Sequence, residues 1–142
     1  MLFGRSKRQI TRLLVVEDEP LIAFDTEHFL TDSGFTIIGT VDRVAEAVAL
    51  LDSGATVDLV LVDVSLADGS GIDVAHAARR HDVPVLFVTG NCPVEAEGIA
   101  AGCLAKPYAQ RDLLAAIHAI DDAMQGKAAK RLPGGFRLFA QG

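Results

Sequence analysis

Runs of apolar residues alternate along the chain with stretches whose apolar positions recur at helical spacing. Five short runs are typical of strands, and they occupy residues 13–16, 35–41, 57–63, 83–90 and 104–105. Helices are predicted by apolar spacings of three and four, and they cover Pro20 to about Gly34, Val44–Leu51, residues 72–81 and Leu113–Met124. Strands without polar interruptions are typical of sheets covered on both faces. The pattern therefore predicts an α/β fold with a doubly wound, five-stranded parallel sheet.

Three segments do not fit this regular alternation. The stretch between Thr89 and Lys106 is short and rich in Gly and Ala, so we expect the fourth helix to be stunted or mobile. After Gly126 the apolar pattern dissolves, and we expect residues 126–142 to form a basic, flexible tail in which Phe136 and Phe139 stay undocked. Residues 1–11 form a basic N-terminal extension, which leaves residues 12–125 as the predicted folded domain.

The charge distribution argues against nucleic acid as a partner. All 19 acidic residues lie between Glu17 and Asp122, while eight of the 13 Lys and Arg residues lie outside that span. An acidic domain with basic ends is not typical of a nucleic-acid reader, so we expect no DNA-binding domain.

The sequence also lacks the usual signs of export. No apolar run approaches 20 residues, so no membrane span is expected. The basic N-terminus lacks the apolar stretch of a secretory signal, and Cys92 and Cys103 have no disulfide or metal spacing. We expect a cytoplasmic protein in which both cysteines act as small apolar residues.

Polar side chains follow four of the five predicted strands. Glu17 and Asp18 follow the first strand, Asp63 follows the third, Thr89 ends the fourth and Lys106 follows the fifth. Because ligands bind at the carboxyl ends of parallel strands, these groups are expected to gather at one edge of the sheet.

Crowded carboxylates at such an edge predict a site for a hard cation. Carboxylates raise one another's pKa unless a cation intervenes, and Mg²⁺ prefers oxygen ligands while it keeps several waters. Asp18 and Asp63 would each supply a carboxylate oxygen, and the backbone carbonyl of Ser65 would supply a third ligand.

The same groups suit phosphoryl transfer. Asp63 would act as the nucleophile and form an acyl phosphate, while Lys106 would pair with a phosphoryl oxygen. The Thr89 hydroxyl and the backbone amides of Gly90 and Val64 would donate hydrogen bonds to the phosphoryl group.

The segments VVEDEP, LVDVSLADGSG, FVTG and LAKPY, in this order, resemble a response-regulator receiver domain over residues 12–125. The resemblance implies a flavodoxin-like (βα)5 fold and a signalling protein that catalyses only its own phosphorylation and dephosphorylation. It implies that Asp18 binds Mg²⁺ directly and Glu17 through water, that Asp63 is the phosphoacceptor, that Thr89 is the switch hydroxyl and that Lys106 is the essential lysine. It also implies that the Lys106–Pro107 peptide bond is often cis.

Some positions depart from the common receiver pattern. Cys103 stands where most receivers have Tyr or Phe, and Ala67 stands where many have Pro. PVLFVTGN and LAKPY resemble the "FAT GUY" subgroup of single-domain receivers from alphaproteobacteria, with Val88 and Asn91 as differences. That subgroup implies a sensor histidine kinase of the HWE/HisKA2 type. Because Cys103 replaces the aromatic residue, we expect the ordering of residues 91–103 to carry the signal.

Three functions remain open from the sequence. The first is a stand-alone response regulator, since only 17 residues follow Gln125, which signals by contact with an unknown downstream protein or acts as a phosphate sink. The second is a phosphorylation-independent adaptor, a pseudo-receiver that regulates a kinase by binding. The third is a phosphatase with an aspartyl nucleophile, but the sequence lacks a DxDxT motif and the GxxxxGK[ST] and GxGxxG nucleotide motifs.

Overall fold

The five strands predicted from the sequence form one parallel sheet in the computed structural model, which describes residues 8–128 and 132–139. The strands are, in chain order, β1 (Arg12–Val16), β2 (Thr36–Val41), β3 (Leu59–Val62), β6 (Val85–Thr89) and β7 (Gly102–Ala105). Their order across the sheet is β2-β1-β3-β6-β7. The chain first turns to one side of β1 and then continues on the other side, so β1 and β3 form the switch point at which such sheets bind ligands.

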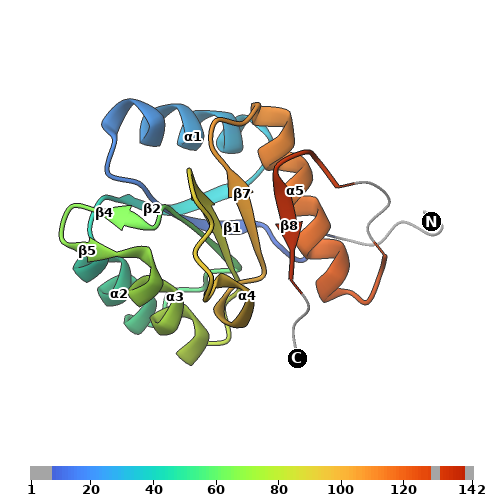
Figure 1. Cartoon of the computed structure of the whole chain (residues 1–142). Helices are drawn as coiled ribbons and strands as arrows, with labels where there is room; N and C mark the ends of the chain where they lie inside the picture. Colours follow the sequence, from blue (N-terminus) through green and yellow to red (C-terminus); the bar gives the residue numbers. More distant parts are fainter. Residues whose placement is uncertain (1–7, 129–131, 140–142) are drawn as a thin grey trace.

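Helices cover both faces of this sheet, as predicted for a doubly wound fold. They are α1 (Pro20–Asp32), α2 (Val44–Asp52), α3 (Gly71–Arg80), α4 (Ala96–Ile99) and α5 (Gln110–Met124). Figure 1 shows α1 and α5 on one side of the sheet, and α2, α3 and α4 on the other. Helix α4 has only four residues, which agrees with the expected short fourth helix.

The burial of β1 explains why its sequence is apolar throughout. Leu13 and Val15 pack against α1 and α5, while Leu14 and Val16 pack on the opposite face, and none of the four is more than 2% exposed. Successive side chains of a strand point to opposite faces, so a sheet covered on both sides needs apolar residues at every position.

A short hairpin follows the third parallel strand and was not predicted. Strands β4 (Ser65–Leu66) and β5 (Gly69–Ser70) pair in antiparallel fashion, and Asp68 lies in the turn between them. Its carboxylate accepts hydrogen bonds from the backbone N–H groups of Val44 (2.6 Å) and Ala45 (3.1 Å). These bonds lower the pKa of Asp68 and satisfy the free N–H groups at the start of α2.

The C-terminal segment adds a sixth strand to the sheet, which differs from the flexible tail that the sequence predicts. Strand β8 (Phe136–Leu138) pairs with β7 in antiparallel fashion, and Phe136 and Phe139 are only 7% and 6% exposed. The two rings lie in the cores on opposite faces of the sheet, because successive residues of an extended chain point to opposite sides and these two are three positions apart. Residues 129–131 and 140–142 of the predicted tail lie outside the described residues.

The described part of the N-terminal extension is attached to α5. Ile10 is 1% exposed, and the buried Asp121 accepts hydrogen bonds from the backbone N–H groups of Gln9 (3.0 Å) and Ile10 (2.9 Å). Arg8 forms an ion pair with Asp122 at 2.8 Å. Residues 1–7 of the predicted extension lie outside the described residues. Within residues 8–128 and 132–139, no helix is long and apolar enough to span a membrane.

Candidate functional site

The acidic residues predicted at the strand ends lie together at the switch point of the sheet. Val16 and Val62 are paired in the parallel register of β1 and β3, so the residues that follow them emerge side by side. Glu17, Asp18 and Asp63 each place a carboxylate oxygen within 4.8 Å of the others. The parallel register therefore produces the cluster that the strand-end pattern predicts.

Lys106 brings a positive charge into this cluster from the end of β7. Its Nζ donates hydrogen bonds to Asp63 Oδ2 at 2.8 Å and to Glu17 Oε1 at 3.1 Å. All three side chains are largely buried: Lys106 is 21% exposed, Asp63 14% and Glu17 8%. The Lys106–Pro107 peptide bond is cis, as the resemblance implied.

The electrostatics of the cluster follow from this arrangement. Burial raises the pKa of Glu17 above its usual value, although the hydrogen bonds from the Glu19 N–H and from Lys106 oppose that shift. Burial by itself would lower the pKa of Lys106, but its hydrogen bonds with Asp63 and Glu17 outweigh burial and raise it. Lys106 therefore stays protonated near neutral pH, and one ammonium faces three carboxyl groups.

The cluster has the donor set of a magnesium site. Three carboxyl groups close together, with a single ammonium, retain negative charge that a hard divalent cation can neutralise. Glu17 and Asp63 each accept one hydrogen bond from Lys106 and one from a backbone N–H. Ser65 lies two residues beyond Asp63, and its backbone N–H donates to Asp63 Oδ1 at 3.2 Å.

Thr89 reaches the same edge of the sheet, but its hydroxyl bonds elsewhere. It is the last residue of β6 and pairs with Ala105, and the Lys106 N–H donates to the Thr89 carbonyl at 2.9 Å. The Thr89 hydroxyl donates to the Asn91 carbonyl at 3.3 Å. Gly90 is exposed, and a Cβ at that position would meet no atom within 4 Å. The backbone around Gly90 is therefore open to an incoming group.

Gly71 packs directly against the backbone of Asp63, and the sequence reasoning missed its role. A Cβ on Gly71 would lie 2.2 Å from the Asp63 carbonyl oxygen. The Gly71 N–H donates to the carbonyl of Val64 at 2.7 Å, which fixes the turn directly after Asp63. The only signal in the sequence was the DGSG run that leads into α3.

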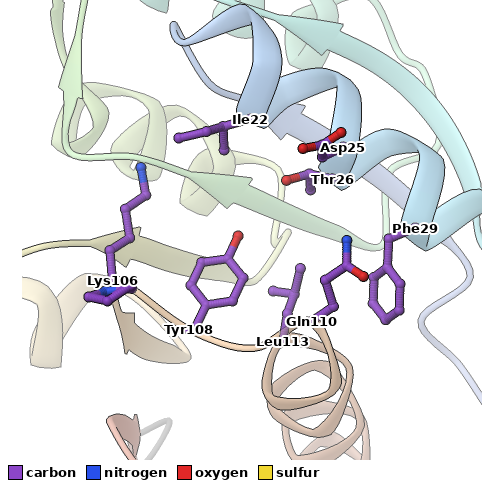
Figure 2. Close-up of a pocket in the computed structure, with 9 residues that line it drawn as sticks. Ile22, Asp25, Thr26, Phe29, Lys106, Tyr108, Gln110 and Leu113 are labelled. Carbon is purple, nitrogen blue, oxygen red and sulfur yellow. The ribbon is translucent and has the colours of Figure 1, made fainter.

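Tyr108 is a second residue that the sequence reasoning missed at the site. Its side chain hydrogen-bonds with Thr26 of α1, and burial raises its pKa. It stands beside a cavity of about 490 Å³ between α1 and the loop that joins β7 to α5. In Figure 2 the Tyr108 hydroxyl points toward Thr26, and the extended Lys106 side chain lies next to the ring.

Two large apolar side chains of α1 near this cavity are exposed to solvent. Leu21 is 80% exposed and Phe24 is 67% exposed, while Ile22, one residue after Leu21, lines the cavity itself. Large apolar side chains that remain in water next to a cavity are typical of a protein contact surface. Lys106 lines the same cavity, so the cavity adjoins the acidic cluster.

Comparisons with known proteins point to response regulators. A family model described as "Response regulator receiver domain" matches residues 13–118. The regulator PhyR of Methylorubrum extorquens is 40% identical over 81 residues, which cover 56% of this chain and 30% of PhyR. The cell cycle transcriptional regulator CtrA of Caulobacter vibrioides is 31% identical over 124 residues, which cover 82% of this chain and 53% of CtrA. The chain thus spans about half the length of CtrA, and less of PhyR.

Solved structures show the same likeness. A response regulator receiver protein from Sinorhizobium medicae superposes with a TM-score of 0.71 at 27% identity, covering 82% of this chain and 98% of that one. The signal receiver domain of a modulated diguanylate cyclase from Desulfovibrio desulfuricans superposes with a TM-score of 0.73 at 28% identity, with the same coverage of 82% and 98%.

Proposed function

Because this chain belongs to the response-regulator receiver domain family, we propose that it is a phosphoacceptor that takes a phosphoryl group from a sensor histidine kinase onto Asp63. The observation that carries the proposal is the direct contact of Lys106 with both Asp63 and Glu17 in the acidic cluster. A structural carboxylate at a strand end needs no buried ammonium and no second and third carboxylate beside it. A phosphoryl acceptor needs all of them.

The transfer step follows from the positions of these groups. A carboxylate oxygen of Asp63 forms a bond to phosphorus as the phosphorus–nitrogen bond of the donor phosphohistidine breaks, and the leaving imidazole keeps the electron pair. In the structure Asp63 Oδ2 bonds Lys106, while Oδ1 accepts the Ser65 N–H. After transfer one Asp63 oxygen is bonded to phosphorus, and the carboxyl group no longer carries a negative charge. Lys106 then moves to a phosphoryl oxygen, where the negative charge now lies.

The residues present fit a resident Mg²⁺. Asp18 and Asp63 would hold it directly, together with the backbone carbonyl of Ser65, and Glu17 would bind through water. When bound, Mg²⁺ offsets the negative charge that the carboxylates and the phosphoryl oxygens bring together. Lys106 supplies further positive charge through its hydrogen bond to Asp63 Oδ2.

The proposed signal starts at Thr89. The backbone amides of Gly90 and Val64 and the Thr89 hydroxyl would bind the phosphoryl oxygens. If that hydroxyl turns toward the phosphoryl group, it gives up its bond to the Asn91 carbonyl. The bond joins the end of β6 to the loop that leads into α4. Its loss would rearrange residues 91–103. This supports output through that segment, since Cys103 replaces the aromatic residue that most receivers have.

The exposed apolar surface beside the site supports a kinase as donor. A phosphohistidine must come within bonding distance of Asp63, so its carrier must dock on the rim of the site. Leu21, Phe24 and the cavity next to Tyr108 form the apolar part of that rim. A kinase of the HWE/HisKA2 type is the donor that the sequence resemblance implies. Phosphorylated protein would then contact a downstream protein or drain phosphate from a shared kinase.

Phosphotransfer from kinases tests this proposal. Purified sensor histidine kinases, each autophosphorylated with radiolabelled ATP, are mixed with the wild-type chain and with the Asp63→Asn variant in MgCl₂. We expect at least one kinase to lose label rapidly to the wild type and none to label the variant. A kinase that binds the chain tightly but transfers no label would instead support the adaptor. Steady turnover of phosphate esters would support the phosphatase.

A further inference from the structure

Strand β8 covers an edge of the sheet that β7 would otherwise present to solvent. The three paired positions join Gly102 with Leu138, Cys103 with Arg137 and Leu104 with Phe136. Backbone hydrogen bonds of 2.9 Å at each end frame the pairing, from Ala105 N–H to the Gly135 carbonyl and from Phe139 N–H to the Ala101 carbonyl. An uncovered strand edge offers a row of backbone groups that can pair with a strand of another chain. In this protein the row is occupied by the chain's own C-terminal segment (Figure 1).

The contacts of β8 show which side chains the edge accepts. Gly102 provides the seat for an aromatic ring, because a Cβ there would lie 2.7 Å from the Phe136 ring. Phe139 enters the core on the other face, next to α4. Between the rings, Arg137 stacks over Phe139 at 5.2 Å and approaches Glu97 of α4 at 3.8 Å. The edge thus fits an extended segment with two aromatic residues three positions apart and a basic residue between them.

Several features make β8 easier to release than the other strands. It has three residues and pairs on one side only, whereas β3 and β6 pair on both sides. Its ion pair with Glu97 is exposed, with side-chain exposures of 64% and 71%, so the pair contributes little. Short, singly paired strands with exposed contacts open at a lower free energy than a central strand.

The vacated edge would be continuous with an existing cavity. A cavity of about 870 Å³ lies at the end of β8, and Leu138 and Phe139 line it together with Ile120 and Met124 of α5. Release of β8 would join this cavity to the seat of the two aromatic rings. The result is an elongated groove beside an unpaired strand, which is the geometry that strand addition requires.

From these contacts we propose that the edge of β7 is a docking site for an extended segment of a partner protein. The segment carries aromatic residues where β8 has Phe136 and Phe139, and β8 must leave before it binds. Recognition comes from backbone pairing with β7 and from the two ring sites. This site is distinct from the acidic cluster, and the proposal does not depend on phosphorylation of Asp63.

A reversible clamp on β8 tests the proposal in the full-length chain. Cys103 lies directly opposite Arg137, and opposed residues of antiparallel strands have Cα atoms about 4.5–5.5 Å apart, within the range that a disulfide spans. The Arg137→Cys variant, made with Cys92→Ser to prevent other pairing, closes a disulfide between positions 103 and 137 on oxidation. The same protein after reduction is its matched control, and Cys92→Ser alone controls for the oxidant.

The probe is a fluorescein-labelled peptide with the sequence LPGGFRLF, which is that of residues 132–139. Fluorescence anisotropy should show an affinity about tenfold or more weaker for the oxidised clamp than for the reduced protein, because the clamp removes the open state. The Phe136→Ala/Phe139→Ala double variant should bind about tenfold more tightly than wild type, since its own strand competes less. A peptide in which both Phe residues are Ser should not bind.

Equal peptide binding by the oxidised and reduced forms would overturn the proposal. So would failure of the disulfide to form, because the two positions would then not be opposed. Amide hydrogen exchange gives an independent test in the wild type, which needs no variant to fold. The Phe139 amide should exchange about tenfold or more faster than the Val60 amide of the central strand β3. Equal protection would mean that β8 opens only when the whole protein unfolds, and that result would also overturn the proposal.

Discussion

Replacing Asp18 with Asn should stabilise the folded protein in the absence of divalent cations. Glu17, Asp18 and Asp63 place carboxylate oxygens within 4.8 Å of one another, and Lys106 hydrogen-bonds only to Glu17 and Asp63 among them. Asp18 therefore adds a negative charge to a group that already has an excess of it. Asparagine keeps the size and polarity of the side chain and removes that charge.

The magnitude follows from the separation of the charges. Two unit charges 4.8 Å apart repel by about 3.5 kcal/mol at an effective dielectric constant near 20, and Asp18 faces two such neighbours. The Lys106 ammonium cancels much of this repulsion, and water and salt screen the partly exposed Asp18. We therefore expect a gain of about 1–2 kcal/mol in the free energy of unfolding.

Urea unfolding followed by far-UV circular dichroism, in EDTA and in MgCl₂, measures this change. In EDTA the variant should be more stable than wild type. At a Mg²⁺ concentration ten times its Kd, wild type should gain about 1.4 kcal/mol and the variant almost nothing. Asp32→Asn, which changes an exposed acid at the end of α1, is the matched control and should respond to Mg²⁺ as wild type does. A variant that is less stable than wild type in EDTA, or that gains equally from Mg²⁺, would refute the reasoning.

Three further predictions concern burial and packing. Gly102→Ala should lower the free energy of unfolding in urea by about 1–3 kcal/mol, because the added Cβ meets the Phe136 ring. Gly98→Ala, whose Cβ points into open space, is the control and should change stability little. Equal effects of the two substitutions would contradict the packing of Phe136 on Gly102. Burial raises the pKa of Glu17, so its contribution to stability is present below its unfolded pKa and is lost as the pH rises through its folded pKa. Glu17→Gln should therefore flatten the fall in stability as the pH rises above the ordinary glutamate pKa, and an unchanged slope would count against this. Asp121→Asn should lower the free energy of unfolding by about 2 kcal/mol in thermal unfolding, because the buried acceptor of the Gln9 and Ile10 N–H groups loses its charge. An unaltered Tm would show that these bonds to the N-terminal segment contribute little.

The sheet and the acidic cluster could be predicted because both follow from local pattern and parallel topology. Strands such as β3 are apolar at every position, and this pattern indicates burial on both faces without knowledge of their neighbours. Once the strands are parallel, the residues after them must meet at one edge. Asp63 and Lys106 are 43 positions apart, yet their 2.8 Å contact needs no other information.

The strand β8 and the cap of α2 could not be predicted because each depends on a distant partner. Phe136 and Phe139 lie in a segment rich in Gly and basic residues, which by itself does not indicate burial. The Phe136 ring is buried because it packs on Gly102 at the edge of β7, and the Phe139 ring because it packs next to the short α4. Asp68 lies in a turn of unremarkable sequence, and its role appears only because the hairpin carries it to the start of α2.

Trapping of the acyl phosphate tests the central claim most directly. The full-length chain is incubated with phosphoramidate and MgCl₂, reduced with borohydride and digested, and the modified residue is identified by mass spectrometry. We predict one phosphoryl group per chain in the intact mass and reduction at Asp63 alone, with both lost in EDTA and in the Asp63→Asn variant. An unmodified wild-type protein in MgCl₂, or an adduct that persists in Asp63→Asn, would contradict the account.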